Sequence, residues 1–408
     1  MRVNEIDMVV TKRNLESTFG ISKVKLGSVL QCYFILFGED GQEGLGHVSL
    51  SPGWCDTRQL DGTDADQIKS RKDMDMYGHV MAGKECLESM AVIDHPSEFV
   101  DTFLENFCGS SYPALGVMNA IAAIDMALWD LHAKSQEKPV FELDEVKDVL
   151  HDRKADRVKV MHTVGLGANL ENVQTYVGEH GLTSLKVKVT GYNMDEDVET
   201  LIRMGNIFEI EHIVADFNEG CETSEYLAHV VSLLPEHVKA KLDAIEQPFK
   251  RNCLDQRIPK LKGIRVILDE GYVIHNDIVN AKAEGYTDVA LKISPRPFSE
   301  TLRTVEEAEK LGMGLWVMDL TNGWPIAYSA ALELASRVGS DTGSEFNGRF
   351  FYGGPEKGSC FHNEVAYDPK DGHVSLNGLD VGPGWGISRD LFDECRRGDP
   401  LFIPNISI

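Results

Sequence analysis

The feature that most constrains the fold is a repeat of short β-rich runs, each followed by a helical stretch, that begins after residue 156. Seven runs have this form, and an eighth is predicted over residues 342–346. Successive run ends, from the second run to the sixth, are 23 to 30 residues apart, which leaves room for one strand, one helix and two loops. The repeat predicts a closed (β/α)8, TIM-like barrel over residues 157–365, in preference to an open doubly wound sheet.

The residues before and after this repeat have other patterns. Residues 29–37 are typical of a strand, and helical periodicity follows, strongest in NAIAAIDMALWDLHAK at 119–134. We therefore predict an α+β capping domain over residues 1–156. The tail, residues 366–408, is rich in turn residues and is predicted to return onto that domain. Within the repeat, an amphipathic helix is predicted over 194–209, with one face formed by Val198, Leu201, Gly205 and Phe208.

Composition excludes several classes of protein. The chain is 42% hydrophobic, and no stretch approaches the roughly 20 apolar residues that cross a bilayer. The formal net charge of −25 would repel phosphate backbones and anionic lipids, so neither nucleic acid nor membrane is an expected partner. The first residues lack the features of a secretory signal, and the eight cysteines form no CxxC pair. We expect a cytoplasmic protein without a zinc ribbon or a disulfide framework.

Charged residues stand at five consecutive run ends, and the strand ends of such barrels carry the active site. These residues are Lys188, Asp216, Glu246, Asp269 and Lys292. Three carboxylates that converge on adjacent strands repel one another unless a cation joins them, and hard oxygen ligands suit Mg²⁺, with Mn²⁺ as an alternative. The pattern predicts a divalent metal site on the three carboxylates. For any one of them taken alone, a strand-end cap or a surface charge is the alternative.

The lysines in this pattern favour acid/base chemistry. Lys186 and Lys188 are two apart on one predicted strand, so both side chains point to the same, inner face. Mutual repulsion and a nearby metal would lower the pKa of Lys188 and let it act as a base near neutral pH. Lys292 lies four strands further round, so Lys188 and Lys292 would face opposite sides of one bound molecule. Ion pairing with barrel carboxylates is the alternative for each lysine.

The motifs together resemble the enolase superfamily, in its mandelate racemase and muconate lactonizing enzyme branch. ALWDLHAK at 127–134 is similar to the capping-domain helix of that family, and DGHVSLNGLDVGPGWGI at 371–387 to its C-terminal return. Between them LKVKV, ADFNEG, IEQPF, LDEG and ALKIS follow in family order. The resemblance covers nearly the whole chain. It implies a barrel with a capping domain, bound Mg²⁺, and proton abstraction beside a substrate carboxylate through an enediolate.

The resemblance also implies roles for individual residues. Asp216, Glu246 and Asp269 would be the metal ligands, and Lys188 and Lys292 the acid/base pair. Three more residues would act beside them. Asn218 and Glu270 would neighbour the metal shell, while Lys186 would contact the substrate carboxylate and depress the pKa of Lys188.

Three departures from the family pattern limit this interpretation. No histidine ends the seventh run, so the lysine-pair, muconate lactonizing type fits better, and either Asp319 or Asn322 could fill the polar place there. FELDEVKDVLHDRKADR at 141–157 replaces the usual Leu-Leu-Gly-Gly ending. Glu345 stands where dipeptide epimerases carry an ammonium-binding pair, and a solvated strand end is the alternative for it. Core packing is the favoured role for at least one of Trp316 and Trp324, over a cation–π contact to a substrate amine.

Two opposed bases favour a racemase or epimerase that acts on a small-molecule carboxylate. An acid dehydratase or a cycloisomerase is the alternative within the family, and a metal-binding scaffold without catalysis is the alternative from another class. The resemblance further implies a homo-oligomer. The loop near residues 18–25 and the loops beyond the strand ends would select the substrate, so the sequence leaves its identity open.

Overall fold

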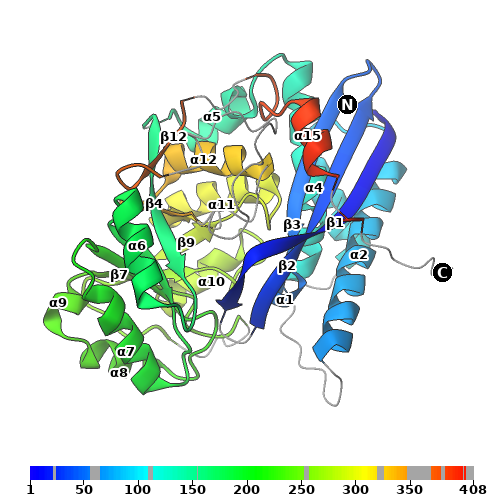
Figure 1. Ribbon diagram of the computed structural model, residues 1–408. Coiled ribbons are helices and arrows are strands. Elements are labelled where there is room, and N and C mark those ends of the chain that lie inside the picture. Colours follow the sequence, from blue (N-terminus) through cyan, green and yellow to red (C-terminus); the bar gives the residue numbers. More distant parts are fainter. Residues whose placement is uncertain are drawn as a thin grey trace.

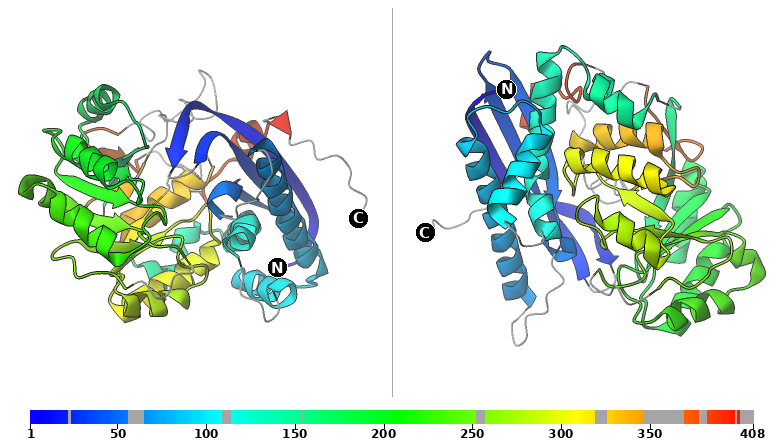
Figure 2. Two further views of the ribbon diagram at one scale, coloured as in Figure 1. Left: turned by 90° about the horizontal axis from the view of Figure 1, so that it is seen from below. Right: turned by 180° about the vertical axis from the view of Figure 1, so that it is seen from behind.

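A computed structural model describes the chain except for residues 22–23, 56–64, 109–113, 154, 252–256, 319–325, 347–368, 378–381, 398 and 401–408. The described residues form an antiparallel sheet of four strands and a mainly parallel sheet of nine, which lie beside each other in Figures 1 and 2. The strands are β1 (Val3–Ile21), β2 (Val24–Gly38), β3 (Glu43–Leu50), β4 (Arg157–Val164), β5 (Ser184–Lys188), β6 (His212–Asp216), β7 (Leu242–Glu246), β8 (Arg265–Leu268), β9 (Asp288–Leu291), β10 (Gly314–Val317), β11 (Ser344–Glu345), β12 (His373–Ser375) and β13 (Asp399–Pro400).

Helices cover both sheets. The α-helices are α1 (Pro52–Cys55), α2 (Ala65–Ser89), α3 (Ser97–Phe103), α4 (Leu115–Ser135), α5 (Asp144–Leu150), α6 (Leu170–His180), α7 (Met194–Gly205), α8 (Ser224–Leu233), α9 (Glu236–Lys239), α10 (Asp277–Glu284), α11 (Phe298–Leu311), α12 (Ile326–Val338) and α15 (Arg389–Cys395). A π-helix, η1 (Leu104–Cys108), continues α3, and a 3₁₀ turn, η2 (Val140–Glu142), precedes α5. None of the described helices is both long and apolar enough to span a bilayer.

The larger sheet has the order β10-β9-β8-β7-β6-β5-β4-β11, and all of these strands are parallel. Because β11, late in the chain, pairs with β4, the first of these strands, the sheet curls back on itself. β12 adds to β4 in the antiparallel direction. The prediction of a mixed α/β chain built on a parallel βα repeat is confirmed, and β11 lies inside the predicted eighth run.

Short connections with capped helix ends fix the direction in which each strand begins, as the connection between α6 and β5 shows. The Asn169 side chain caps α6 by accepting from the backbone N–H of Glu171 at 2.8 Å. The same helix ends at Gly181, whose φ of 60° lies in the left-handed region. Three residues later β5 begins, so the helix and the following strand are held antiparallel by a minimal turn. The carboxyl ends of β5 to β9 consequently meet at one end of the sheet.

The inside of the curled sheet is filled by apolar side chains. Seven buried residues form this inner cluster: Met161, Val214, Ala244, Ile267, Ala290, Trp316 and Met318. The Trp316 indole donates to Asp288 Oδ1 at 2.9 Å, and the Arg265 guanidinium lies 4.5 Å from the ring centroid. Core packing, with an internal cation–π contact, is therefore the role of Trp316. Trp324 lies outside the described residues.

The capping part is built by α4 lying close against β3. A Cβ at Gly46 would lie 1.9 Å from the Ala123 carbonyl oxygen, and one at Gly44 would lie 2.2 Å from that of Ala127. Only glycine permits this approach of helix to strand. The alanines on the facing side of α4 keep the gap equally small, so the sequence fixes the depth at which the helix sits.

Hydrogen bonds join α4 to the parallel sheet's helix α11 and to the tail. The Trp129 indole donates to Ser299 Oγ at 3.0 Å, and Ser299 donates through its N–H and its hydroxyl to Asp125 at 3.0 and 2.5 Å. Burial raises the pKa of the Asp125 carboxyl to about 7. From the tail, the Trp385 N–H donates to Asp130 Oδ1 at 2.8 Å, and β13 pairs with β1.

One packing prediction is wrong. Helix α7 ends at Gly205, and Phe208 lies beyond it with a relative exposure of 94%. The predicted helix was extended beyond the residue at which α7 ends, so Phe208 does not share the buried face of Leu201.

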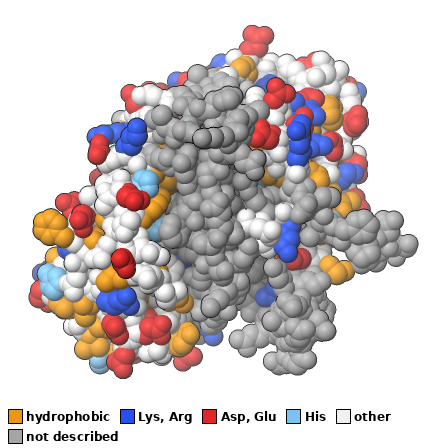
Figure 3. Space-filling view, in the orientation of Figure 1, with side chains coloured by type: hydrophobic (Ala, Val, Ile, Leu, Met, Phe, Trp, Pro, Cys, Tyr) orange, Lys and Arg blue, Asp and Glu red, His pale blue; other side chains and the backbone are white. Residues whose placement is uncertain are grey.

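Over the α7 to α9 region at the lower left of Figure 3, acidic and basic side chains are interspersed, so this part of the described surface mixes both signs of charge.

Candidate active site at the strand ends

The charged run ends come together as the spacing predicted. Lys188 is paired in register with Asp216, and Asp216 with Glu246, on neighbouring strands β5, β6 and β7. Asp269 directly follows β8, and Lys292 directly follows β9. All five residues are buried, with relative exposures of 5% or less. The order of strands in the sheet thus places three carboxylates in a row, with a lysine on either side.

Lysine ammonium groups neutralise these carboxylates in the structure. Lys188 Nζ lies 2.5 Å from Asp216 Oδ2, and Lys292 Nζ lies 2.6 Å from Asp269 Oδ2. Lys186 Nζ contacts Glu246 at 2.8 Å, Glu345 at 2.9 Å and Asp216 at 3.2 Å. The predicted inner-face position of Lys186 and Lys188 follows from these contacts. The ion pairs that were the structural alternative for the lysines are present as well.

Several oxygens of the site keep no hydrogen-bond partner among the described residues, although they are buried. They are Glu246 Oε2, Asp269 Oδ1, Glu270 Oε2 and Asn218 Oδ1. Burial, reinforced by the Asp216 carboxylate, raises the pKa of Glu246 well above its ordinary value, because its negative charge is incompletely compensated. A set of buried oxygen acceptors with excess negative charge is what a hard divalent cation requires, so these residues fit Mg²⁺.

The pKa of Lys188 differs from the prediction. Burial and the charge of Lys186 lower it, but Asp216, Glu345 and Glu246 together outweigh them, so the pKa is raised above its ordinary value. The repulsion between the two lysines, on which the prediction relied, is present. The ion pair with Asp216, which the prediction left out, decides the direction for the chain's own charges, and the lowering of the pKa by a bound metal stays a prediction.

A tryptophan from the capping part completes the site and was missed in the sequence. Trp54, on α1, donates its indole N–H to Glu270 Oε1 at 2.9 Å, and its ring centroid lies 4.5 Å from Lys292 Nζ. Asn218 Nδ2 donates to the same Glu270 oxygen at 3.1 Å. Burial raises the pKa of Glu270 to about 8. Asn218 and Glu270 therefore lie beside the carboxylates, as predicted, and Trp54 covers them.

An arginine ties this tryptophan to the parallel sheet. The Arg251 guanidinium donates two hydrogen bonds to the carboxylate of Glu219, at 2.9 and 2.7 Å. It also donates to the backbone oxygens of Trp54 and Cys55, at 3.1 and 3.3 Å. Glu219 belongs to the ADFNEG motif, which was its only sequence signal. Trp54 stands in SPGWC just after a strand, and nothing in its own surroundings points to residues some 200 positions away.

The backbone at two strand ends adopts a costly conformation. Asn218, Glu219 and Gln247 have φ values of 41°, 66° and 34°, in the left-handed region that non-glycine residues rarely enter. Gln247 accepts from the N–H of Asp269 at 2.8 Å. Residues held in such regions cluster at functional sites because the surrounding structure must compensate for the cost. Here the conformation turns Asn218 toward Glu270 and fixes the start of the loop that carries Asp269.

Other predicted site residues have different outcomes. Glu345 is 3% exposed, accepts from Thr163 Oγ1 at 2.5 Å and contacts Lys186, so the solvated strand end that was its alternative is wrong. Asp319 and Asn322 lie outside the described residues. The side chains of the predicted selectivity segment, residues 18–25, also lie outside them.

Two family models match the chain. The description "Enolase C-terminal domain-like" covers residues 168–393, and "Mandelate racemase / muconate lactonizing enzyme, N-terminal domain" covers residues 31–143. The chain belongs to the enolase superfamily. Within it, the match to the N-terminal model places the chain in the mandelate racemase and muconate lactonizing enzyme branch, as the motifs indicated.

Two characterised relatives are similar to the chain over part of their length. An L-Lys-D/L-Arg epimerase from Desulforapulum autotrophicum is 33% identical over 141 residues, which are 34% of the chain and 36% of that protein. An N-succinyl-L-Arg/Lys racemase from Bacillus cereus is 29% identical over 164 residues, 38% of the chain and 41% of the relative. The matched part thus spans well under half of each relative.

Solved structures share the fold over nearly the whole chain. The dipeptide epimerase from Enterococcus faecalis V583, complexed with Mg and the dipeptide L-Leu-L-Tyr, has a TM-score of 0.72 at 18% identity, over 95% of the chain and 100% of the neighbour. The Bacillus cereus N-succinyl Arg/Lys racemase has a TM-score of 0.72 at 20% identity, over 97% and 98%. These relatives are all enzymes, so the chain belongs to a family of enzymes.

Proposed function

We propose that this protein is a Mg²⁺-dependent racemase or epimerase that abstracts the proton next to a substrate carboxylate. The single observation that carries the proposal is the placement of two lysines across three carboxylates. Lys188 ends β5 and Lys292 follows β9, with β6, β7 and β8 between them. An arrangement in which two bases approach one carbon from opposite sides has a direct use in inverting that carbon.

Asp216, Glu246 and Asp269 would hold the cation. When bound, Mg²⁺ would stabilise the negative charge that the substrate carboxylate gains as the neighbouring proton leaves. Glu246 Oε2 and Asp269 Oδ1 support this assignment, since both are buried and have no hydrogen-bond partner among the described residues. The Mg²⁺ in the structure of the Enterococcus faecalis epimerase supports it further.

The chain's own residues would move the proton. Lys188, the last residue of β5, and Lys292, directly after β9, are buried amines on either side of the three carboxylates, so each is proposed as acid or base for one face of the substrate. Lys186, held by Glu246 and Glu345, would contribute a fixed positive charge near the substrate carboxylate. Trp54 would exclude water from the side of Lys292.

The substrate class follows from the relatives. One relative acts on a Lys–Arg dipeptide by its name and another on N-succinyl Arg or Lys, so we propose an N-acylated amino acid, as a dipeptide or an N-succinyl derivative. In such molecules the carbon to be inverted lies between an amide nitrogen and a carboxyl carbon, which suits a site with one cation and two flanking bases. Dehydration or cycloisomerisation of an acid remains the alternative reaction, since one lysine suffices for a syn elimination.

The experiment that tests the proposal is solvent-deuterium exchange followed by NMR, with Lys188→Ala and Lys292→Ala. The wild type should exchange the α-proton of both stereoisomers of an N-succinyl amino acid or dipeptide. Each variant should lose exchange from one stereoisomer, keep it from the other and show no net inversion. Loss of exchange from both stereoisomers in only one variant, with the other near wild type, would contradict two-base chemistry and support elimination.

Further parts of the proposal concern the architecture and setting. We propose that the curled sheet closes as a full (β/α)8 barrel over residues 157–365, with residues 1–156 and 366–408 forming the capping domain. Pairing of β11 with β4 supports closure. Tail residues contact α4 and β1, which supports the return. We propose a homo-oligomer in the cytoplasm, without nucleic-acid or membrane partners, consistent with the charge of −25.

A further inference from the structure

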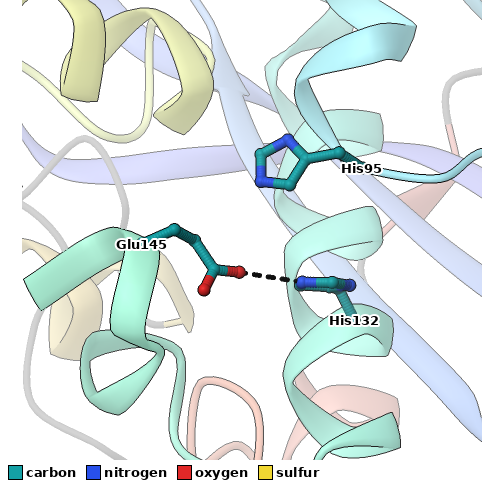
Figure 4. A group of neighbouring side chains, drawn as sticks. All are labelled: His95, His132 and Glu145. Atoms are coloured by element: carbon teal, nitrogen blue, oxygen red, sulfur yellow. Dashed lines mark hydrogen bonds and ion pairs between the residues drawn. The ribbon is translucent and has the colours of Figure 1, made fainter. Parts of the chain in front are cut away.

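We propose that His95, His132 and Glu145 form a second metal site, separate from the strand-end carboxylates, that binds a transition cation of the Zn²⁺ class. One ligand atom from each of the three side chains lies within 4.8 Å of the other two. Figure 4 shows the three side chains pointing toward one another from separate elements. His95 precedes α3, His132 lies on α4, and Glu145 lies in the first turn of α5.

The ligand atoms of the three side chains lie within 4.8 Å of one another. His132 Nε2 lies 2.9 Å from Glu145 Oε1, and the ring centroids of His95 and His132 are 5.7 Å apart at an interplanar angle of 70°. Ligands about 2.0–2.1 Å from Zn²⁺ in tetrahedral geometry are about 3.3 Å from one another. Small side-chain rotations would therefore bring the three atoms around one ion.

A second contact orients His95 for this role. Its Nδ1 accepts from the backbone N–H of Ser97 at 3.3 Å and lies 2.7 Å from Ser97 Oγ, so two contacts with Ser97 fix the direction of the ring. The ring also stands perpendicular to Trp129, with centroids 5.0 Å apart, which limits its rotation. His95 is thus held in place before any ion binds.

The charge of the site matches a cation. Burial and the charges of His132 and Arg303 lower the pKa of His95, while the carboxylates of Glu145 and Glu98 act in the opposite direction. Arg303 is itself paired with Asp101 and Glu300, at 2.7 Å in each case, which limits its repulsion of a bound ion. Glu145 contributes one negative charge directly.

The donor set selects the class of cation. Two imidazoles and one carboxylate suit Zn²⁺ and its neighbours in the first transition row, whereas Mg²⁺ prefers oxygen ligands and keeps its water. The amide of Gln136 lies 3.0 Å from His132 Nε2, and half a turn of that amide would offer its oxygen as a fourth ligand. The Glu145 side chain is 37% exposed, so solvent reaches this side of the site.

A bound ion would fasten three elements of the capping part to one another, beside its contact with the parallel-sheet part. It would tie the start of α3 and the start of α5 to the end of α4, next to Trp129, which donates to Ser299 on α11. Glu145, though not the two histidines, lies within residues 141–157, the stretch that departs from the family pattern. None of the three ligands belongs to the proposed active site, so the ion would be a structural one and the inference does not depend on the proposed function.

The test is Zn²⁺ titration of the full chain in excess Mg²⁺, by calorimetry with metal analysis, beside thermal unfolding. We expect one Zn²⁺ per chain and a higher unfolding temperature with Zn²⁺. His95→Phe keeps a ring on Trp129, and Glu145→Gln keeps the shape and a hydrogen bond to His132. Each should weaken Zn²⁺ binding by at least about 100-fold, because loss of a direct ligand exceeds the effect of losing an outer partner.

His229→Phe is the matched control, because His229 is exposed on α8, and it should bind Zn²⁺ as the wild type does. Each variant must show an unfolding temperature near that of the wild type without Zn²⁺, which excludes misfolding as the cause. Wild-type stoichiometry and affinity in both His95→Phe and Glu145→Gln would overturn the proposal. So would the absence of Zn²⁺ binding to the wild type in excess Mg²⁺, which would leave a hydrogen-bonded His132–Glu145 pair.

Discussion

Replacing Lys186 by methionine tests whether the charges at the strand ends are held in balance by lysine. Lys186 is 1% exposed, and its ammonium group contacts Asp216, Glu246 and Glu345 at 3.2, 2.8 and 2.9 Å. Methionine fills a similar volume without charge, so the change creates little empty space. What it removes is the counter-charge of three buried carboxylates.

Two effects decide the magnitude. Removing one partner of a buried ion pair costs about 3–5 kcal/mol, because the remaining charge is buried without compensation. Loss of the exposed Lys239–Glu236 pair, at 2.9 Å, should cost under about 1 kcal/mol by comparison. For a unit of barrel size, 1 kcal/mol shifts the unfolding midpoint by about 2–4 °C. Lys186→Met should therefore lower that midpoint by about 10 °C, and Lys239→Met by no more than about 4 °C.

Thermal unfolding by circular dichroism is the assay, with and without Mg²⁺. The gap between Lys186→Met and wild type should narrow in Mg²⁺, since a divalent cation supplies the counter-charge that methionine cannot. In the double variant Lys186→Met, Glu345→Gln, one of the three stranded carboxylates is gone, so the loss should be smaller than the sum of the single losses by about 0.5–3 kcal/mol. Equal midpoints for Lys186→Met and Lys239→Met in metal-free buffer would refute the reasoning.

Three further changes have definite expected outcomes. Glu246→Gln should weaken Mg²⁺ binding by removing a charged oxygen ligand. Removal of metal from the wild type by a chelator should abolish activity, and added Mg²⁺ should restore it. Full turnover in metal-free buffer would disprove the dependence on Mg²⁺. Trp54→Phe keeps a ring over Lys292 but loses the bond to Glu270, so proton exchange at the Lys292 face should slow more than at the opposite face, as ²H NMR can measure. Because the folded-state pKa of Asp125 is raised to about 7, its contribution to stability is full below pH 4 and is lost as pH rises through 7; urea unfolding of Asp125→Asn should lack this slope.

The periodic part of the structure could be predicted from the sequence, because strand and helix spacing there depends on local patterns. The run ends fell on β5, β6 and β7, and directly after β8 and β9. Since parallel strands meet at one end, the order of Asp216, Glu246 and Asp269 along the chain was enough to predict that they converge. The helix over α4 was predicted for the same reason, from apolar residues at helix spacing.

What could not be predicted depends on contacts between distant segments. Trp54 meets Glu270 only because α1 docks on the strand ends, and no local pattern reports such docking. The pKa of Lys188 depends on the sum of several opposing charges whose distances the sequence does not contain. The error at Phe208 has a local cause, because the helical periodicity was extended beyond the residue where α7 ends.

The hydrogen bond from the Trp54 indole to Glu270 affects the order in which the active site forms during folding. Its two ends are 216 residues apart, so the contact closes a very large loop and forms after the local βα units have appeared. During refolding, helical circular dichroism should therefore recover before the water-excluding cover over Lys292 is in place. A chain caught between these stages would have its lysines and carboxylates assembled yet open to solvent, and catalytic competence would be the last property to return.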